Sequence, residues 1–248
     1  MSNESDASMK SRPLIIALIV AAVVIAGVAI YFIPRSEPTV LPTAGAPEAT
    51  PEEAAPPAVA ETPAAPTAEG DDLMVAGPLG EKWLGSADAP VTIIEYASMT
   101  CSHCQRFHTT TYPTLKTKYI DTGKVRFIFR EFPLDSLAAG AIMLARCAPG
   151  DNYFPIVELL FEHQREWAFV EKPLDALFGF MRQAGFTQES FRACLSNQEV
   201  LDGVSWVRDR AAEKFGVEST PSFFINGKKY AGALEIEELD KIIEPLLN

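Results

Sequence analysis

A run of twenty uncharged, mostly aliphatic residues near the N-terminus constrains this chain more than any other feature. Residues 14–33, LIIALIVAAVVIAGVAIYFI, would form a helix about 30 Å long, which matches the hydrocarbon core of a bilayer. Lys10 and Arg12 precede the run, whereas only Arg35 follows it closely. This bias favours a cytoplasmic N-terminus, residues 1–13. The sequence therefore predicts one transmembrane anchor over residues 14–33, with the rest of the chain across the membrane.

A cleaved secretory signal peptide is the alternative interpretation of this run. The only nearby site that resembles a cleavage motif is Ala44-Gly45-Ala46. It lies too far beyond an apolar segment that is already long for a signal peptide. We therefore favour an anchor that is not removed.

Residues 34–72 have a very different composition. They contain nine prolines, ten alanines, eight acidic residues and a single base, with almost no large apolar side chains. Such a segment cannot bury enough apolar surface to offset the entropy that it would lose on ordering. We predict a disordered, extended linker that offers no surface for self-association.

Residues 73–248 are sufficient for one domain of ordinary size. They contain no cluster of basic residues, which disfavours nucleic acid as a partner. All four cysteines lie in this domain, and an even number beyond an export segment suits an oxidising compartment. The predicted elements are a strand (91–97), a helix, a second strand (124–132), helices over 136–215, a hairpin around Asn226-Gly227 and a helix over about 235–244.

The stretch MTCSHCQRFH, residues 99–108, follows the first predicted strand and admits three interpretations. Cys101, Cys104 and His108 could share a helix face as metal ligands, but no second CxxC or HxxxH completes a zinc site. A purely structural disulfide would close too short a loop to stabilise the fold. We favour a redox pair and expect His108, like His163, to lie on a helix surface.

The redox interpretation assigns different roles to the two cysteines. Cys101 would lie at a helix N-terminus, where free N–H groups and the helix dipole stabilise a thiolate. Cys104 would follow one turn later, within disulfide distance, as the sheltered resolving thiol. His103 would add a hydrogen-bond donor or a positive charge, lower the pKa of Cys101 and make the disulfide more oxidising. Alternatively, His103 is a solvated surface residue.

Glu95 lies within the predicted strand, six residues before Cys101. A carboxylate buried at this position is costly unless it has a function. We interpret Glu95 as a proton acceptor and donor for Cys104. The alternative is that the strand turns one polar side chain to water.

Together these features resemble the DsbA-like branch of the thioredoxin superfamily. The resemblance covers about residues 88–248 and rests on Glu95, the CxHC motif, REFPLD (130–135), LARC (144–147), FRACL (191–195) and STPSFFING (219–227). It implies an α/β thioredoxin-like fold with an inserted helical domain over about 133–215.

The resemblance also implies several site residues. Pro221 would follow a cis peptide bond, and Thr220 would offer its backbone to an extended substrate chain beside Cys101. Ser102 stands where the best-known oxidases have proline, so it should alter the stiffness of the loop next to the substrate. The oxidising compartment, the even count and the family motifs together favour a structural disulfide between Cys147 and Cys194 over the alternative of two buried free thiols in helices.

The expected function is that of a monomeric thiol–disulfide oxidase with no cofactor besides the Cys101–Cys104 disulfide. It would be held in a bacterial inner membrane by a single span, with its domain in the periplasm. Its partners would be exported, reduced or unfolded proteins and a quinone-linked membrane oxidase of the DsbB type. The alternatives are a disulfide isomerase or reductase and, less favoured, a tethered copper or zinc carrier.

Overall fold

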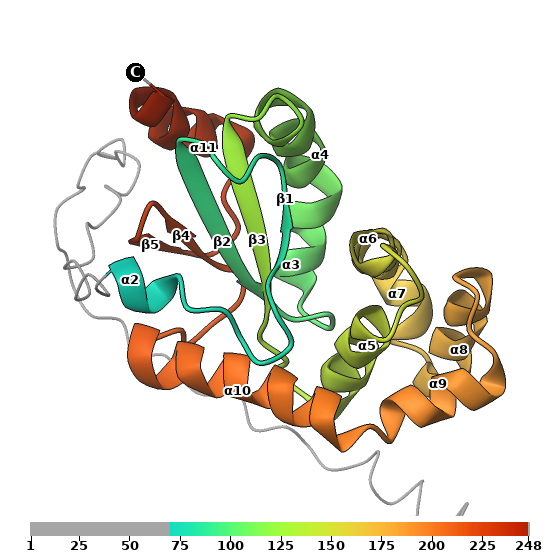
Figure 1. Ribbon diagram of the computed structural model, residues 1–248. Helices are drawn as coiled ribbons and strands as arrows, with labels where there is room; N and C mark the ends of the chain where they lie inside the picture. Colours follow the sequence, from blue (N-terminus) through green and yellow to red (C-terminus); the bar gives the residue numbers. More distant parts are fainter. Residues whose placement is uncertain (1–69, 248) are drawn as a thin grey trace, which may run out of the picture. The chain divides into compact units, whose positions relative to one another are not determined.

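A five-stranded sheet in the order β1-β3-β2-β4-β5 is the centre of the structure, a computed structural model that describes residues 70–247 (Figure 1). β2 and β3 are parallel, and the other neighbours are antiparallel. The strands are β1 (Lys82–Leu84), β2 (Val91–Ala97), β3 (Val125–Glu131), β4 (Ser222–Ile225) and β5 (Lys228–Ala231).

Successive side chains of β2 point to opposite faces of the sheet, so the core has two layers. Ile93 packs with side chains from α3 (Ser102–Arg106) and α11 (Ile236–Ile243). Ile94 and Tyr96 pack instead with side chains from α10 (Gln198–Phe215), which crosses the opposite face of the sheet (Figure 1). Because strand side chains alternate between faces, Glu95 lies on the same side as Ile93. This places its carboxyl group under the helix that carries the CxxC motif.

The first long helix is not regular along its length. After α3 it continues through η1 (Phe107–Thr111), α4 (Tyr112–Leu115) and η2 (Lys116–Ile120), and both η segments are π-helical. Pro113 lies in the first turn of α4 and has no N–H to donate to the preceding turn. The wider turn around it changes which residues face the core.

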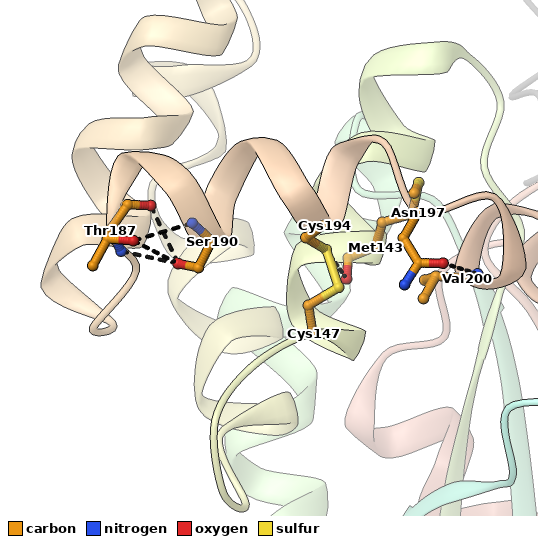
Figure 2. Close-up of a disulfide and its surroundings, with 7 residues drawn as sticks. All are labelled: Met143, Cys147, Thr187, Ser190, Cys194, Asn197 and Val200. Carbon is orange, nitrogen blue, oxygen red and sulfur yellow. Dashed lines mark hydrogen bonds between the residues drawn. A yellow bond between two sulfur atoms is a disulfide. The ribbon is translucent and has the colours of Figure 1, made fainter.

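An inserted helical layer separates β3 from β4, as the sequence predicts. Asp135 caps α5 by accepting a 2.7 Å hydrogen bond from the N–H of Ala138. Thr187 caps α9 through a reciprocal pair with Ser190 (Figure 2). The helices of this layer are α5 (Ser136–Arg146), α6 (Tyr153–Glu162), α7 (Gln164–Trp167), α8 (Pro173–Gln183), α9 (Gln188–Leu195) and α10.

The C-terminal hairpin forms at the predicted turn. β4 and β5 pair with Ile225 opposite Lys228. Asn226 and Gly227 both have positive φ, 43° and 84°, which is the conformation that a two-residue hairpin of this kind requires.

Two elements at the start of the domain were not predicted. The short helix α2 (Gly70–Leu73) includes residues 70–72, whose composition predicted that they belong to the linker. β1 is only three residues long and adds an antiparallel edge to β3.

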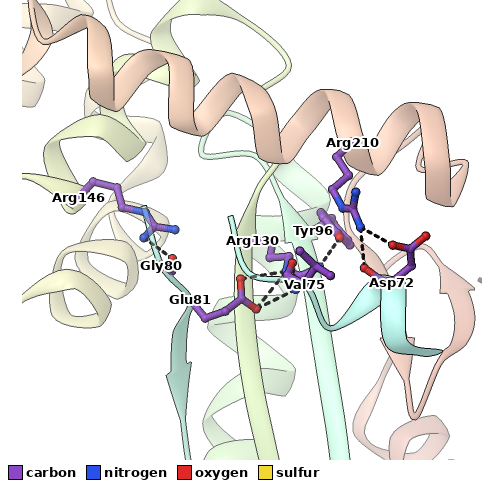
Figure 3. A network of polar contacts seen from close by, with 8 residues as sticks. All are labelled: Asp72, Val75, Gly80, Glu81, Tyr96, Arg130, Arg146 and Arg210. Carbon is purple, nitrogen blue, oxygen red and sulfur yellow. Dashed lines mark hydrogen bonds and ion pairs between the residues drawn. The ribbon is translucent and has the colours of Figure 1, made fainter. Parts of the chain in front are cut away.

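Ion pairs hold this N-terminal segment against the sheet and α10 (Figure 3). Arg130 donates to Glu81 at 2.8 Å and to the hydroxyl of Tyr96 at 2.8 Å. Arg210 of α10 pairs with Asp72 at 3.0 Å. The partners come from segments far apart in the sequence, so periodicity alone could not predict them.

The predicted N-terminal segment, anchor and most of the linker, residues 1–69, lie outside the described residues. Between residues 70 and 247, none of the helices combines the length and apolar character needed to cross a bilayer.

Candidate active site

Cys101 and Cys104 lie where β2 gives way to α3. Cys101 is the N-cap residue of α3, with extended backbone angles of φ −79° and ψ 121°. Its N–H donates to the carbonyl oxygen of Ser98 at 3.1 Å, which closes the turn after the strand. Both cysteines are free thiols, and Cys104 is fully buried whereas Cys101 is 9% exposed. The N-terminal sulfur is therefore the more accessible of the two.

The two sulfurs have opposite electrostatic environments. The hydrogen bond from Cys104 lowers the pKa of Cys101 to about 5, with help from the backbone N–H groups of Cys104 and His103 and against the effect of burial. Burial raises the pKa of Cys104 well above its ordinary value, and the bond to Cys101 and the charge of Glu95 raise it further. The pair therefore consists of one sulfur that is stable as a thiolate and one that is stable as a thiol.

Ser102 and His103 are exposed at the start of α3. The part of His103 that contributes to the lowered pKa of Cys101 is its backbone N–H. The role that the sequence assigns to its imidazole, and the role of Ser102 beside a substrate, stay predictions.

Glu95 is fully buried in β2, which excludes the alternative that it turns to water. Its Oε2 atom lies 2.9 Å from Nε2 of His108. The expectation that His108 lies on a helix surface is wrong, because its side chain is only 3% exposed. His108 follows Cys104 by one turn, on the face that the π-helical segment η1 directs into the core. That i, i+4 spacing, followed by an aromatic at Tyr112, is the signal that could have identified it.

The peptide bond between Thr220 and Pro221 is cis, as the resemblance implied. The carbonyl oxygen of Thr220 lies 3.3 Å from Sγ of Cys101 and accepts its hydrogen bond. Residues separated by 119 positions in the sequence are thus brought into contact at the site. The backbone of Thr220 lies directly beside the accessible sulfur.

This geometry agrees with the similarity to known proteins. The sequence model of a family described as thioredoxin matches residues 79–245. The crystal structure of Wolbachia pipientis alpha-DsbA1 is 32% identical, covers 72% of this chain and 96% of its own, and superimposes with a TM-score of 0.67. The chain belongs to the DsbA-like thiol–disulfide oxidoreductases of the thioredoxin superfamily.

Other relatives of this DsbA-like chain differ in sequence identity and in the share of their length that matches. A candidate protein-disulfide oxidoreductase of Rickettsia bellii is 32% identical over 169 residues, 66% of this chain and 65% of that protein. The chain spans between 54% and 65% of the length of the first Rickettsia relatives it matches. Oxidised BdbD of Bacillus subtilis, at 21% identity and a TM-score of 0.57, shares the fold.

In this DsbA-like chain the helical layer also supports the CxxC loop, which sequence reasoning missed. Gln164 of α7 is buried and donates from Nε2 to the carbonyl oxygens of Met99 at 2.8 Å and of Cys101 at 3.0 Å. Thr100 donates to the N-cap carboxylate Asp135 at 2.6 Å. A lone glutamine 63 residues after Cys101 carries no sequence signal for this contact.

The second cysteine pair forms the predicted disulfide. Cys147 follows α5 and Cys194 lies in the last turn of α9, with a Cα–Cα distance of 6.1 Å (Figure 2). The carbonyl oxygen of Met143 lies 3.1 Å from Sγ of Cys194. This bond joins two helices of the inserted layer.

The residues of the metal hypothesis are not arranged as a ligand set. Within residues 70–247 no three His, Cys, Asp or Glu side chains are grouped to hold a metal ion. His108 directs its Nε2 atom to Glu95.

Proposed function

We propose that this chain is a thiol–disulfide oxidase that donates the Cys101–Cys104 disulfide to exported, reduced proteins. The observation that carries the proposal is the asymmetry of the two sulfurs, one turn apart in α3. The lowered pKa of Cys101 stabilises the reduced enzyme, and a stable reduced form makes the disulfide a strong oxidant. The raised pKa of the buried Cys104 suits a sulfur that is protonated whenever the disulfide is open.

The reaction proceeds by two exchanges of sulfur. A client thiolate attacks Cys101, the Cys101–Cys104 bond breaks, and its electron pair passes to Cys104, which takes up a proton. A second client thiolate then attacks the client sulfur of the mixed disulfide, and Cys101 leaves as a thiolate. The client is oxidised to a disulfide, and the enzyme is reduced to a dithiol.

The client would bind beside Cys101 as an extended chain. The backbone of Thr220, held next to the sulfur by the turn at Pro221, would offer its hydrogen-bonding groups to such a chain. Ser102 is exposed at the start of α3 and would contact the client. In this mode the enzyme binds the client's backbone rather than its side chains, which suits unfolded clients of varied sequence.

The cellular setting of the proposal rests on the sequence. The apolar run 14–33 would anchor a monomer in a bacterial inner membrane, and the linker would let the domain reach clients in the periplasm. A quinone-linked oxidase of the DsbB type would restore the disulfide. No cofactor is needed, because the two sulfurs carry the electrons.

Trapping of mixed disulfides tests the roles of the cysteines. Cys104→Ala should accumulate client proteins bound through Cys101, whereas Cys101→Ala should capture none. The matched control is the double variant Cys147→Ala/Cys194→Ala, which should turn over clients without trapping them. Capture by Cys101→Ala but not by Cys104→Ala would reverse the two roles.

The direction of exchange is tested by the equilibrium of the pair with glutathione. A potential near that of strongly oxidising DsbA, about −120 mV, supports an oxidase. A value near that of thioredoxin, about −270 mV, would instead identify a reductase. Titration of the reduced domain with copper or zinc tests the carrier hypothesis, which requires tight, stoichiometric binding.

A further inference from the structure

The domain contains two histidine–carboxylate pairs that have the same nitrogen–oxygen distance but differ in burial. His108 and Glu95 are 2.9 Å apart, with side chains 3% and 0% exposed. His163 and Glu166 are also 2.9 Å apart, with side chains 33% and 66% exposed. A buried polar pair is an expensive way to stabilise a fold, since an apolar pair of similar volume serves as well or better. Its place beneath the active cysteines calls for a functional explanation.

Aromatic rings surround the imidazole of His108. It stacks on Phe161 of α6 at 4.2 Å and contacts Phe129 of β3 at 5.8 Å between ring centroids. Oε1 of Glu95 and Nδ1 of His108 are buried and have no hydrogen-bond partner among the described residues. The pair therefore keeps one free acceptor on Glu95 in a region closed to solvent.

Among the described residues, few other ionisable groups lie around His108. From α3, Cys104 lies one helical turn away on the inner face. From α4, Tyr112 lies 4.9 Å from the imidazole, and its hydroxyl donates to Glu158 of α6 at 3.1 Å. Burial, with the neighbouring Glu158, raises the pKa of Tyr112, so the phenol stays neutral. Beside the pair itself, Cys104 is thus the group whose protonation changes during disulfide exchange.

We propose that His108 is a positioning residue that holds Glu95 and shares its proton, so that the pair exchanges this proton with Cys104. The inference rests on the proposed function and deepens it. When the disulfide opens, the electron pair of the broken S–S bond goes to Cys104 and a proton from the pair follows. When the disulfide closes, Cys104 returns the proton to the pair as its sulfur bonds to Cys101. The pair is finally re-equilibrated with solvent, so sulfur, electrons and protons balance.

The closing step offers the sharpest test, with oxidised glutathione as the small disulfide. In the first step the Cys101 thiolate attacks glutathione disulfide, forms a mixed disulfide and releases glutathione thiolate. In the second step Cys104 loses its proton, attacks Cys101 and releases the second glutathione. Acid quenching and mass spectrometry of the full chain separate the glutathione adduct from the closed disulfide, so each rate is measured by itself.

His108→Gln is the decisive variant, because glutamine can donate to Glu95 but cannot exchange a proton. We expect the second step to slow about tenfold or more near pH 7, with the first step within about twofold of the parent rate. The pH profile of the second step should also change shape. His163→Gln is the matched control and should leave both steps and their profiles unchanged.

The double variant Glu95→Gln/His108→Gln tests whether the two residues act as a unit. If they do, it should be no slower in the second step than Glu95→Gln alone. If the slowing of the double variant equals the product of the slowing in the two single variants, the residues act independently and do not share a proton.

Three results would overturn the inference in distinguishable ways. Unchanged rate and pH profile in His108→Gln would exclude a role for His108 in proton exchange while leaving the proposed function intact. Equal slowing of both steps, with a lowered melting temperature, would assign His108 a purely structural role. Failure of the parent chain to form the glutathione adduct would refute the proposed function itself and this inference with it.

Discussion

The two cysteine pairs of this domain differ in their position on helices, and the difference explains their chemistry. Cys101 caps the N-terminal end of α3, where the helix dipole and free N–H groups stabilise a thiolate. Cys147 and Cys194 lie at the C-terminal ends of α5 and α9, where the dipole disfavours a thiolate. Because exchange requires a thiolate, the same residue type is reactive at one helix end and inert at the other.

The two pairs also differ in how far apart their cysteines lie in the sequence. The CxxC pair encloses only two residues, so its bond constrains the unfolded chain very little. The other pair is separated by 47 positions and restricts a long loop of the inserted helical layer. One bond is thus suited to be made and broken repeatedly, and the other to remain closed.

The largest effect we predict is on stability, from removing the second disulfide. On the chain-entropy model, Cys147→Ala/Cys194→Ala should lower the free energy of unfolding by about 4 kcal/mol, measured by denaturant titration. The glutathione equilibrium of the Cys101–Cys104 pair should change little, because the inserted layer contacts the CxxC loop through Gln164 and Asp135 rather than through this bond. A large change in that equilibrium would show that the two pairs are coupled.

The next largest effect is a difference between the reduced and the oxidised protein in how their stability depends on pH. The pKa of Cys101 is lowered from 9.0 to about 5 in the folded dithiol form, so this thiolate stabilises the reduced fold above pH 9 and loses its contribution as the pH falls through 5. Between pH 7 and pH 5 the reduced protein should lose about 2 kcal/mol of stability relative to the oxidised protein. Cys104 stays protonated in this range and contributes nothing.

Denaturant unfolding of both redox states at the two pH values provides the measurement. The oxidised protein is the control, since its sulfurs do not titrate and all other groups are common to both states. A difference between the two states that does not vary with pH would contradict the lowered pKa.

Local sequence patterns predicted what local interactions determine. The strand over residues 91–97 and the hairpin at Asn226-Gly227 each follow from neighbouring residues and were found as predicted. The cis bond before Pro221 and the pairing of the second disulfide depended on family resemblance, because neither has a local signal.

The parts that sequence did not predict depend on long-range packing. The edge strand β1 is short and is held by Arg130 and Glu81, which lie 49 residues apart. His108 lies four residues from both Cys104 and Tyr112, and this spacing was a usable signal for its burial. Its contact with Glu95 of β2 has no such signal, because helical periodicity says nothing about partners in other elements.

Gln164→Leu should have a smaller effect and shows how the inserted layer supports the site. The carbonyl of Cys101 keeps its hydrogen bond from the N–H of Gln105, so the variant mainly leaves that of Met99 without its donor. We expect a loss of about 1 kcal/mol in unfolding free energy together with slower exchange at Cys101. Gln188→Leu, on the exposed start of α9, is the control and should change neither quantity. Unaltered exchange in Gln164→Leu would mean that this contact only stabilises the fold.

The smallest predicted effect concerns the side chain of His103, and it sharpens the account of why Cys101 is acidic. His103→Ala removes an exposed imidazole but keeps the backbone N–H that helps to lower the pKa of Cys101. The pKa of Cys101, followed by thiolate absorbance, should therefore rise by less than about one unit, which shifts the equilibrium with glutathione by less than about tenfold. His163→Ala serves as the control. A return of the titration to the range of an ordinary cysteine would show that the imidazole, rather than the helix terminus and Cys104, stabilises the thiolate.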